Sequence, residues 1–271
     1  MLFHGCCVNS ERAKRQKVAR GSLISITTNP ELTLEVKKDK RTRVNAAQNY
    51  REIKDRIESL CLRTARKPNV MLLPVTKTRS LEAIQELYDF GLRDFGESRV
   101  QELLSKRDAL PQDIRWHFIG HLQSNKVKYI APFVHMVHSI HTEAIARELS
   151  KRAEESNRVI PVLMEINISG EAQKHGVTPN DAEAIAIEIS GSCPNVLLSG
   201  VMGMASFEED TEKTRPQFRK LRELRDRIAE RHPELKAFTE LSMGMSNDFE
   251  VAIEEGATIV RIGSALFEER I

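Results

Sequence analysis

The chain has 271 residues, of which 40% are hydrophobic and 30% charged, a composition typical of a globular protein with a substantial core. Its formal net charge is +2, but residues 1–42 hold nine Lys or Arg against four Asp or Glu, which leaves the remainder at −3. The body of the chain therefore lacks the basic surplus of a nucleic-acid-binding protein. The sequence also lacks a run of about 18 consecutive apolar residues, which argues against a membrane span.

The basic segment 1–42 is expected to be a poorly ordered extension, and residues 43–271 are expected to form one domain. The four cysteines form neither a paired framework nor a zinc pattern, so we expect a reducing compartment, the cytoplasm. The run SERAKRQKVARGS has the basic, serine-containing character of a mitochondrial transit peptide. Glu11 and the weak apolar periodicity argue against that interpretation.

Apolar runs and helical patterns alternate along the rest of the chain. Apolar positions within residues 44–65 recur at helical spacing and predict a helix ahead of the first strand. Residues 70–77, VMLLPVTK, are typical of a strand buried on both faces that ends at Lys77. Seven further strands are predicted at 92–96, 115–120, 134–140, 161–167, 196–202, 239–242 and 258–263. Helical patterns fill the intervals at 80–91, 98–110, 123–133, 142–156, 178–190, 211–231 and 247–256.

Eight strands that alternate with helices predict an α/β fold, a single-domain (β/α)8 barrel of the TIM type, because each consecutive pair of strands can be joined by a right-handed crossover. An open doubly wound sheet is the alternative. The barrel is favoured because the sequence continues for eight residues after Gly263, too few for a full eighth helix. The additional N-terminal helix is expected to close the ring instead.

Barrels of this type carry their functional residues at the C-terminal ends of the strands and in the loops that follow. Lys77 stands at such an end, although a strand-end lysine often simply extends into solvent. The segments SMGMSND, after the seventh strand, and RIGS, in the eighth, supply hydroxyls and backbone N–H groups at helix starts, which favour a phosphate. The simpler interpretation is that both are turns and helix caps. Arg261 is expected to face a phosphate or a ring nitrogen, or to pair with a carboxylate of the barrel.

A lysine that faces a phosphate site suits a phosphorylated carbonyl compound, because a desolvated lysine amine attacks a carbonyl carbon to form a Schiff base. Pyridoxal 5′-phosphate (PLP) and the sugar phosphate of an aldolase both meet this description. The residues alone do not rank the two ligands.

A resemblance to the pyridoxal-phosphate homeostasis protein family, which is related to the barrel domain of alanine racemase, is carried by VTKT, FGESRVQE, WHFIGHLQSNK, VHSIH, INISGEAQKHG, LSMGMSNDFEVAI and GATIVRIGSALF. It spans residues 46–271 and implies a single-domain barrel that binds PLP, with Lys77 as the Schiff-base lysine. It also implies that Arg261 approaches the pyridine nitrogen. The phosphate site that it implies consists of Ser242, Met243, Ser246, Gly263 and Ser264.

The chain departs from the family pattern at several positions. Ser98 and Arg99 replace an Asn-Tyr pair, so Ser98 stands where the family places an Asn near the ring hydroxyl. Gly203 replaces a Thr or Ser, His141 replaces an Asp, and Glu268 replaces a Gly. Each departure is expected to loosen contacts with the cofactor.

The resemblance implies a carrier or regulator in PLP homeostasis without robust catalysis, which releases the cofactor to apo PLP-dependent enzymes and is a monomer or weak dimer. An arginine at the pyridine nitrogen supports this function, because it keeps the ring neutral and disfavours carbanion chemistry. The alternative is a PLP-dependent amino-acid racemase. Its second acid or base would have to be His121 or Tyr129.

A metal site is not expected. His135, His138 and His141 have a suggestive spacing, but residues three apart on a strand face opposite sides, so these three should not converge. The charged run KLRELRDRIAER is interpreted as a solvated helix face with ion pairs between positions i and i+4.

Overall fold

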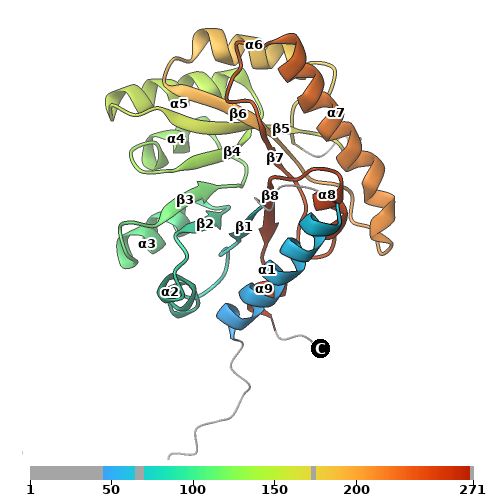
Figure 1. Ribbon diagram of the computed structural model, residues 1–271. Coiled ribbons are helices and arrows are strands. Elements are labelled where there is room, and N and C mark those ends of the chain that lie inside the picture. The colour runs from blue at the N-terminus through green and yellow to red at the C-terminus, as the bar shows by residue number, and fades with distance from the viewer. Residues whose placement is uncertain (1–44, 65–69, 172–174, 269–271) are drawn as a thin grey trace, which may run out of the picture. The chain divides into compact units, whose positions relative to one another are not determined.

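The computed structural model describes residues 45–64, 70–171 and 175–268, so the predicted extension at 1–42 lies outside the described residues. The described part is a nearly closed barrel of eight parallel strands that alternate with helices, which confirms the predicted (β/α)8 fold (Figure 1). The strands are β1 (Met71–Pro74), β2 (Asp94–Glu97), β3 (Arg115–Phe118), β4 (Met136–Ile140), β5 (Ile160–Ile166), β6 (Val196–Gly203), β7 (Glu240–Ser242) and β8 (Ile259–Ile262). None of the helices within these residues combines the length and the apolarity needed to cross a bilayer.

The helices follow the predicted intervals. They are α1 (Ala46–Arg63), α2 (Leu81–Asp89), α3 (Val100–Ala109), α4 (Ser124–Ile130), α5 (Glu143–Glu155), α6 (Ala182–Ser192), α7 (Arg215–Arg231), α8 (Phe249–Glu254) and α9 (Ser264–Phe267), with a 3₁₀ turn at Thr211–Thr214 before α7. Local signals account for their ends. The Ser80 hydroxyl accepts the Ala83 N–H at the start of α2, and Gly91 follows the helix at φ +113°, which favours glycine.

The strand order distinguishes a barrel from an open doubly wound sheet. The strands are hydrogen-bonded in the order β1-β8-β7-β6-β5-β4-β3-β2, so the first and last strands of the chain are neighbours. Leu73 of β1 lies opposite Arg261 of β8. Just beyond the end of β1, Val75 forms a parallel bridge with Gly96 of β2. The ring therefore closes between β1 and β2.

Helix α1 occupies the position that a full last helix would take. It packs beside α8 and α9, as Figure 1 shows. The Asn49 side chain donates to the Leu266 carbonyl at 3.0 Å, and Arg56 pairs with Glu250 of α8 at 2.8 Å. Because α9 has only four residues, these contacts cover an edge that it leaves open. This arrangement is the one expected for the N-terminal helix.

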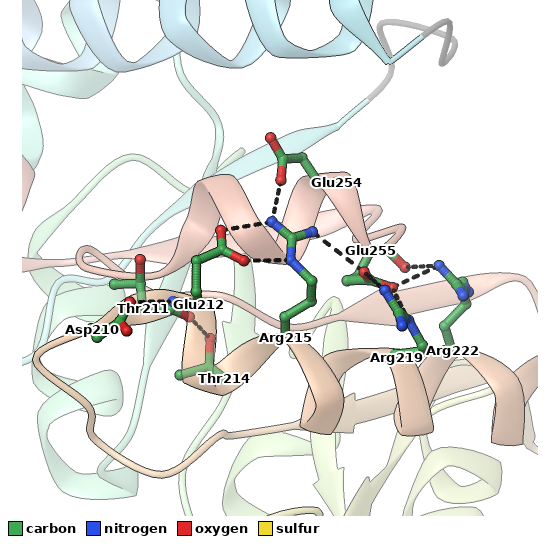
Figure 2. A network of polar contacts seen from close by, with 9 residues as sticks. All are labelled: Asp210, Thr211, Glu212, Thr214, Arg215, Arg219, Arg222, Glu254 and Glu255. Carbon is green, nitrogen blue, oxygen red and sulfur yellow. Dashed lines mark hydrogen bonds and ion pairs between the residues drawn. The ribbon is translucent and has the colours of Figure 1, made fainter.

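Three arginines of α7 converge on one carboxylate at the end of α8. Glu255, directly after α8, accepts hydrogen bonds from Arg215 at 3.3 Å, Arg219 at 2.9 Å and Arg222 at 2.8 Å, as Figure 2 shows. Arg215 also pairs with Glu254. The expected solvated face with ion pairs between positions i and i+4 is therefore wrong for Arg222, whose partner is the nearly buried Glu255. The network fixes α8, and with it the loop after β7.

Candidate functional site

Lys77 lies three residues beyond the end of β1, in a turn at the C-terminal end of the barrel strands. The turn is closed by the Arg79 N–H, which donates to the Thr76 carbonyl at 2.9 Å, and Thr78 has a φ of +62°, which is uncommon for a non-glycine residue. The Lys77 side chain is exposed. Within the described residues its amine has no hydrogen-bond or ion-pair partner. It is therefore available to a ligand, at the position that the sequence predicted.

A buried cluster of charges below the turn holds it in place. The Lys106 amine, on α3, donates to the Thr76 carbonyl at 2.6 Å, to Glu97 at 2.5 Å and to Glu102 at 2.6 Å. The Thr76 hydroxyl donates to the same Glu97 oxygen at 2.8 Å. Glu102 also accepts the Thr78 N–H at 2.6 Å. The residues on both sides of Lys77 are thus fixed by a cluster that sequence reasoning missed.

The loops after β7 and β8 meet each other and the end of the first strand. The Ser246 hydroxyl, after β7, accepts the N–H of Ala265, the second residue of α9, at 3.3 Å. Gly263 lies beside Val75, because a Cβ added to this glycine would be 3.6 Å from the Val75 side chain. Ser264 is exposed at the first position of α9, where backbone N–H groups have no intrahelical acceptor. The structure therefore brings together three of the predicted phosphate-binding residues close to the Lys77 turn.

Arg79 joins the Lys77 turn to the end of α9. Its guanidinium pairs with Glu268 at 2.6 Å and lies 5.5 Å from the centre of the Phe267 ring. Glu268, one of the departures from the family pattern, thus has a structural partner. The Nε atom of Arg79 is buried and has no hydrogen-bond partner among the described residues. An unpaired guanidinium N–H close to these loops favours an anion there.

Arg261 lies in the barrel interior on β8. One guanidinium nitrogen donates to the Ser242 hydroxyl at 2.8 Å and the other to the Gly203 carbonyl at 3.1 Å. Burial lowers the pKa of Arg261 to about 10, although the nearby charges of Asp248 and Glu165 act in the opposite direction. The side chain is therefore cationic at neutral pH and is oriented by two neighbouring acceptors.

Gly203 has a steric reason to differ from the family pattern. A Cβ at this position would lie 2.7 Å from a Leu221 methyl and 2.9 Å from an Ile168 methyl. A Thr or Ser would not fit unless these side chains moved. The glycine at position 203 is thus explained by the close packing of Leu221 and Ile168.

Two of the predicted phosphate ligands, Ser242 and Met243, have buried side chains. Ser242 is fully buried in β7, and its hydroxyl contacts Arg261 and His138 Nδ1, the latter at 3.1 Å. Met243 is also fully buried, and its N–H donates to the Ile259 carbonyl at 3.1 Å. β7 ends at Ser242 and Met243 follows it directly, so both side chains face the protein interior, and the expectation that these two residues cradle a phosphate stays a prediction.

Ser98 lies at the end of β2 and is half-buried. Its N–H is 3.2 Å from Glu97 Oε2, and its carbonyl oxygen would be 2.1 Å from a Cβ added at Gly120. The backbone here packs tightly against the loop after β3. The contact of Ser98 with a ring hydroxyl stays a prediction.

Three imidazoles gather at the mouth of the barrel. The His121 ring stacks on His141 at 4.5 Å and on His175 at 4.1 Å. Burial and these neighbours lower the pKa of His121. His121 thus lies in a histidine group beyond the ends of the strands, whereas Tyr129 is 46% exposed on α4, with the amines of Lys126 and Lys128 at 5.9 and 5.0 Å from the centre of its ring. Of the two alternatives for the second acid or base of a racemase, His121 lies at the mouth of the barrel and Tyr129 lies on the exposed face of α4.

The expectation that His135 and His138 point to opposite sides is wrong. His135 precedes β4, so strand alternation does not apply to it, and both rings lie 5.3 Å from the ring centre of His117. Potential ligand atoms of Asp94, His117 and His135 lie within 4.8 Å of one another. However, Arg115 binds the Asp94 carboxylate at 2.7 and 2.5 Å, so the cluster is already neutralised by the protein. The absence of a metal stays a prediction.

The comparisons with known proteins agree with this geometry. Residues 47–270 match the family described as the alanine racemase N-terminal domain. A pyridoxal phosphate homeostasis protein from Aquifex aeolicus (strain VF5) is 47% identical over 229 residues, which cover 84% of this chain and 99% of the relative. The chain belongs to this family. The pyridoxal phosphate homeostasis protein of Homo sapiens is 36% identical over 233 residues, which cover 81% of this chain and 85% of the relative.

A solved structure of the same kind contains a ligand. PipY of Synechococcus elongatus PCC7942 with PLP bound superposes on this member of the family with a TM-score of 0.70. It is 32% identical and covers 82% of this chain and 100% of its own. The ligand of PipY is the one that the resemblance in sequence implied for this chain.

Proposed function

We propose that this protein binds PLP and acts in its homeostasis, as a carrier or regulator without robust catalysis. The observation that carries the proposal is the meeting of the Lys77 turn with the two loops that contain Ser246 and Gly263. A site for a phosphorylated aldehyde requires an amine for the carbonyl carbon and hydrogen-bond donors for the phosphate. The PLP-bound PipY relative selects PLP over a sugar phosphate.

The donor set fits the cofactor residue by residue. Lys77 supplies the amine for a Schiff base with the aldehyde, and Ser246, Gly263 and Ser264 supply hydroxyl and N–H groups for the phosphate. Arg261 would face the ring nitrogen, and Ser98 would face the ring hydroxyl. When bound in enzymes, PLP supplies an electron sink. A cationic Arg261 weakens that property because it leaves the ring nitrogen unprotonated.

Borohydride reduction tests the lysine. Reduction of the PLP-loaded protein followed by peptide mass spectrometry should give one phosphopyridoxyl adduct, on the peptide that contains Lys77. The adduct should be lost in Lys77→Ala and retained in Lys128→Ala, which removes an exposed lysine of α4. A reduced adduct of similar yield at one other site in Lys77→Ala would overturn the assignment.

The phosphate placement is tested by a pair of ligands. Ser246→Ala should weaken the binding of PLP far more than that of pyridoxal, because a hydrogen bond to a charged group contributes about 1.5–3 kcal/mol. Absorbance titration of both ligands measures the difference. Ser98→Ala is the matched control, since it should affect the two ligands alike. Equal losses for PLP and pyridoxal in Ser246→Ala would contradict the placement.

The carrier function requires that PLP leaves the protein for an acceptor. The partners we propose are apo PLP-dependent enzymes, in the cytoplasm, with the carrier a monomer or weak dimer. The free thiols of the buried Cys61 and Cys193 support a reducing compartment. Mixing the loaded protein with an apo-enzyme should restore that enzyme's activity. The control is the same reaction with an equal amount of free PLP, and both reactions contain a scavenger of free PLP. If the loaded protein restores no more enzyme activity than this control, the proposal is contradicted.

A further inference from the structure

A continuous row of polar side chains crosses the barrel interior from Asp94 to Arg261. Asp94 Oδ1 lies 3.1 Å from His117 Nε2, and His117 Nδ1 lies 3.0 Å from His138 Nε2. His138 Nδ1 lies 3.1 Å from the Ser242 hydroxyl, which accepts a hydrogen bond from Arg261 at 2.8 Å. We call these five residues the interior array.

One step of the array connects two strands that are not neighbours in the sheet. Its members come in order from β2, β3, β4, β7 and β8, and the step from His138 to Ser242 joins β4 to β7, which are separated by two strands in the sheet. His117, His138 and Ser242 are fully buried, and Arg261 is nearly so. Asp94 begins β2, so the array runs from the N-terminal face of the barrel toward the candidate site.

Hydrogen-bond chemistry gives this array one proton order when both imidazoles are neutral. A carboxylate can only accept, so His117 must carry its proton on Nε2 and its Nδ1 must accept. His138 therefore donates from Nε2, and its Nδ1 accepts the Ser242 hydroxyl proton. The hydroxyl oxygen is then free to accept from Arg261. Every link has one donor and one acceptor, and all donors point toward Asp94.

A second order is consistent with the distances if the array gains a proton. A doubly protonated His117 would donate from Nδ1 to His138 Nε2. His138 would then carry its proton on Nδ1 and donate to the Ser242 oxygen, so the Ser242 hydroxyl would no longer donate to His138. Charge opposes this order, because Arg115 already neutralises Asp94 and the cationic Arg261 stands at the other end. The neutral order is therefore preferred.

We propose that Asp94, His117 and His138 are positioning residues that fix the proton of Ser242 and, through it, the orientation of the Arg261 guanidinium. In the neutral order Ser242 donates to His138 and its oxygen accepts from Arg261 alone, whereas in the second order the oxygen would accept from both His138 and Arg261. The consequence for ligand binding rests on the proposed function. The proton order itself does not.

Nitrogen NMR of the protein with ¹⁵N-labelled histidine tests the proton order without any ligand. At neutral pH, His117 and His138 should each show a protonated Nε2 and an unprotonated Nδ1. Asp94→Ala removes the terminal acceptor and should reverse both tautomers. Two protonated nitrogens on His117 of the unaltered protein, or unchanged tautomers in Asp94→Ala, would overturn the proposal.

Two control variants separate the array from other roles of the same residues. Arg115→Lys keeps the compensating charge and should leave both tautomers as they are. His135→Ala removes a ligand of the candidate metal cluster, which the array does not need, and should also leave them unchanged. If His135→Ala reproduces the changes of Asp94→Ala, or if added Zn²⁺ alters the His117 signals in a His135-dependent way, a metal site replaces the array.

PLP titration provides the functional arm. Asp94→Ala should weaken PLP binding on the order of tenfold, the scale of effects from groups that orient a binding residue, and should leave the borohydride adduct on Lys77. Arg115→Lys should bind as the unaltered protein does. Unchanged affinity in an Asp94→Ala protein with reversed tautomers would overturn the link to Arg261. Failure of the unaltered protein to bind PLP would instead refute the proposed function and leave the NMR result standing.

Discussion

Lys106→Met is expected to cost about 3–5 kcal/mol of unfolding free energy, because removal of one partner of a buried ion pair leaves the other charge uncompensated. The amine makes three short contacts, of which the one to Glu97 is 2.5 Å, and the side chains of Lys106 and Glu97 are 5% and 0% exposed. Methionine preserves most of the volume, so the loss is electrostatic. This is a large share of the ~5–15 kcal/mol that stabilises a typical domain.

Urea unfolding followed by the fluorescence of Trp116, the single tryptophan, measures this cost. Glu102→Gln is the matched control, since its side chain is 21% exposed and its loss should cost about 1 kcal/mol. Adding Glu97→Gln to Lys106→Met removes both charges and should recover on the order of 2 kcal/mol. A cost for Lys106→Met below about 1 kcal/mol, or no recovery in the double variant, would refute the reasoning.

Three further outcomes are expected. Although burial opposes it, hydrogen bonds from Arg219 and Arg215 hold the pKa of Glu255 below its usual value of 4.5, so its contribution is present at neutral pH and is lost as the pH falls through the lowered pKa. Glu255→Gln should therefore flatten the acid side of the curve of urea midpoint against pH, and an unchanged curve would contradict this. Gly244→Ala should destabilise the barrel by about 1–3 kcal/mol, because φ is +91° and the new methyl would lie 2.6 Å from that of Ala252. The control Gly263→Ala should keep the urea midpoint of the unaltered protein, so equal midpoints for the two variants would be inconsistent with these geometries. The loaded protein should not racemise L-alanine, L-serine or L-lysine at the ~1–10³ turnovers per second typical of enzymes, and chiral chromatography that finds such turnover would favour a racemase.

The fold could be predicted from the sequence because strands buried on both faces have continuous apolar sequences. The predicted strand at 161–167 is observed as Ile160–Ile166, and that at 196–202 as Val196–Gly203. The barrel followed from their alternation with helices. The positions of the candidate residues were accessible too, since position at a strand end is a local property: Lys77, Ser246 and Gly263 lie in the loops where they were expected. Their roles toward a ligand stay predictions.

Partners far apart in the chain were not accessible. Lys106 is typical of a solvated helix residue by sequence, and only the packing of α3 against the Thr76 carbonyl buries it. The interior array joins residues up to 167 positions apart, from Asp94 to Arg261, and nothing in the local sequence pairs them. The pairing of Arg222 with Glu255 has the same origin. Sequence periodicity fixes which face of an element is buried, but not the residue that it meets there.

The neighbouring position of β1 and β8 has a consequence for synthesis of the protein. Lys77 comes early in the described chain, whereas Gly263 and Ser264 come near its end, and they meet because the first strand pairs with the last. A ribosome-bound chain therefore contains Lys77 long before it contains Gly263 and Ser264. Under the proposed function, a partly made chain would lack a complete pocket, and PLP would be captured with full affinity only after the last strand is made and the ring has closed.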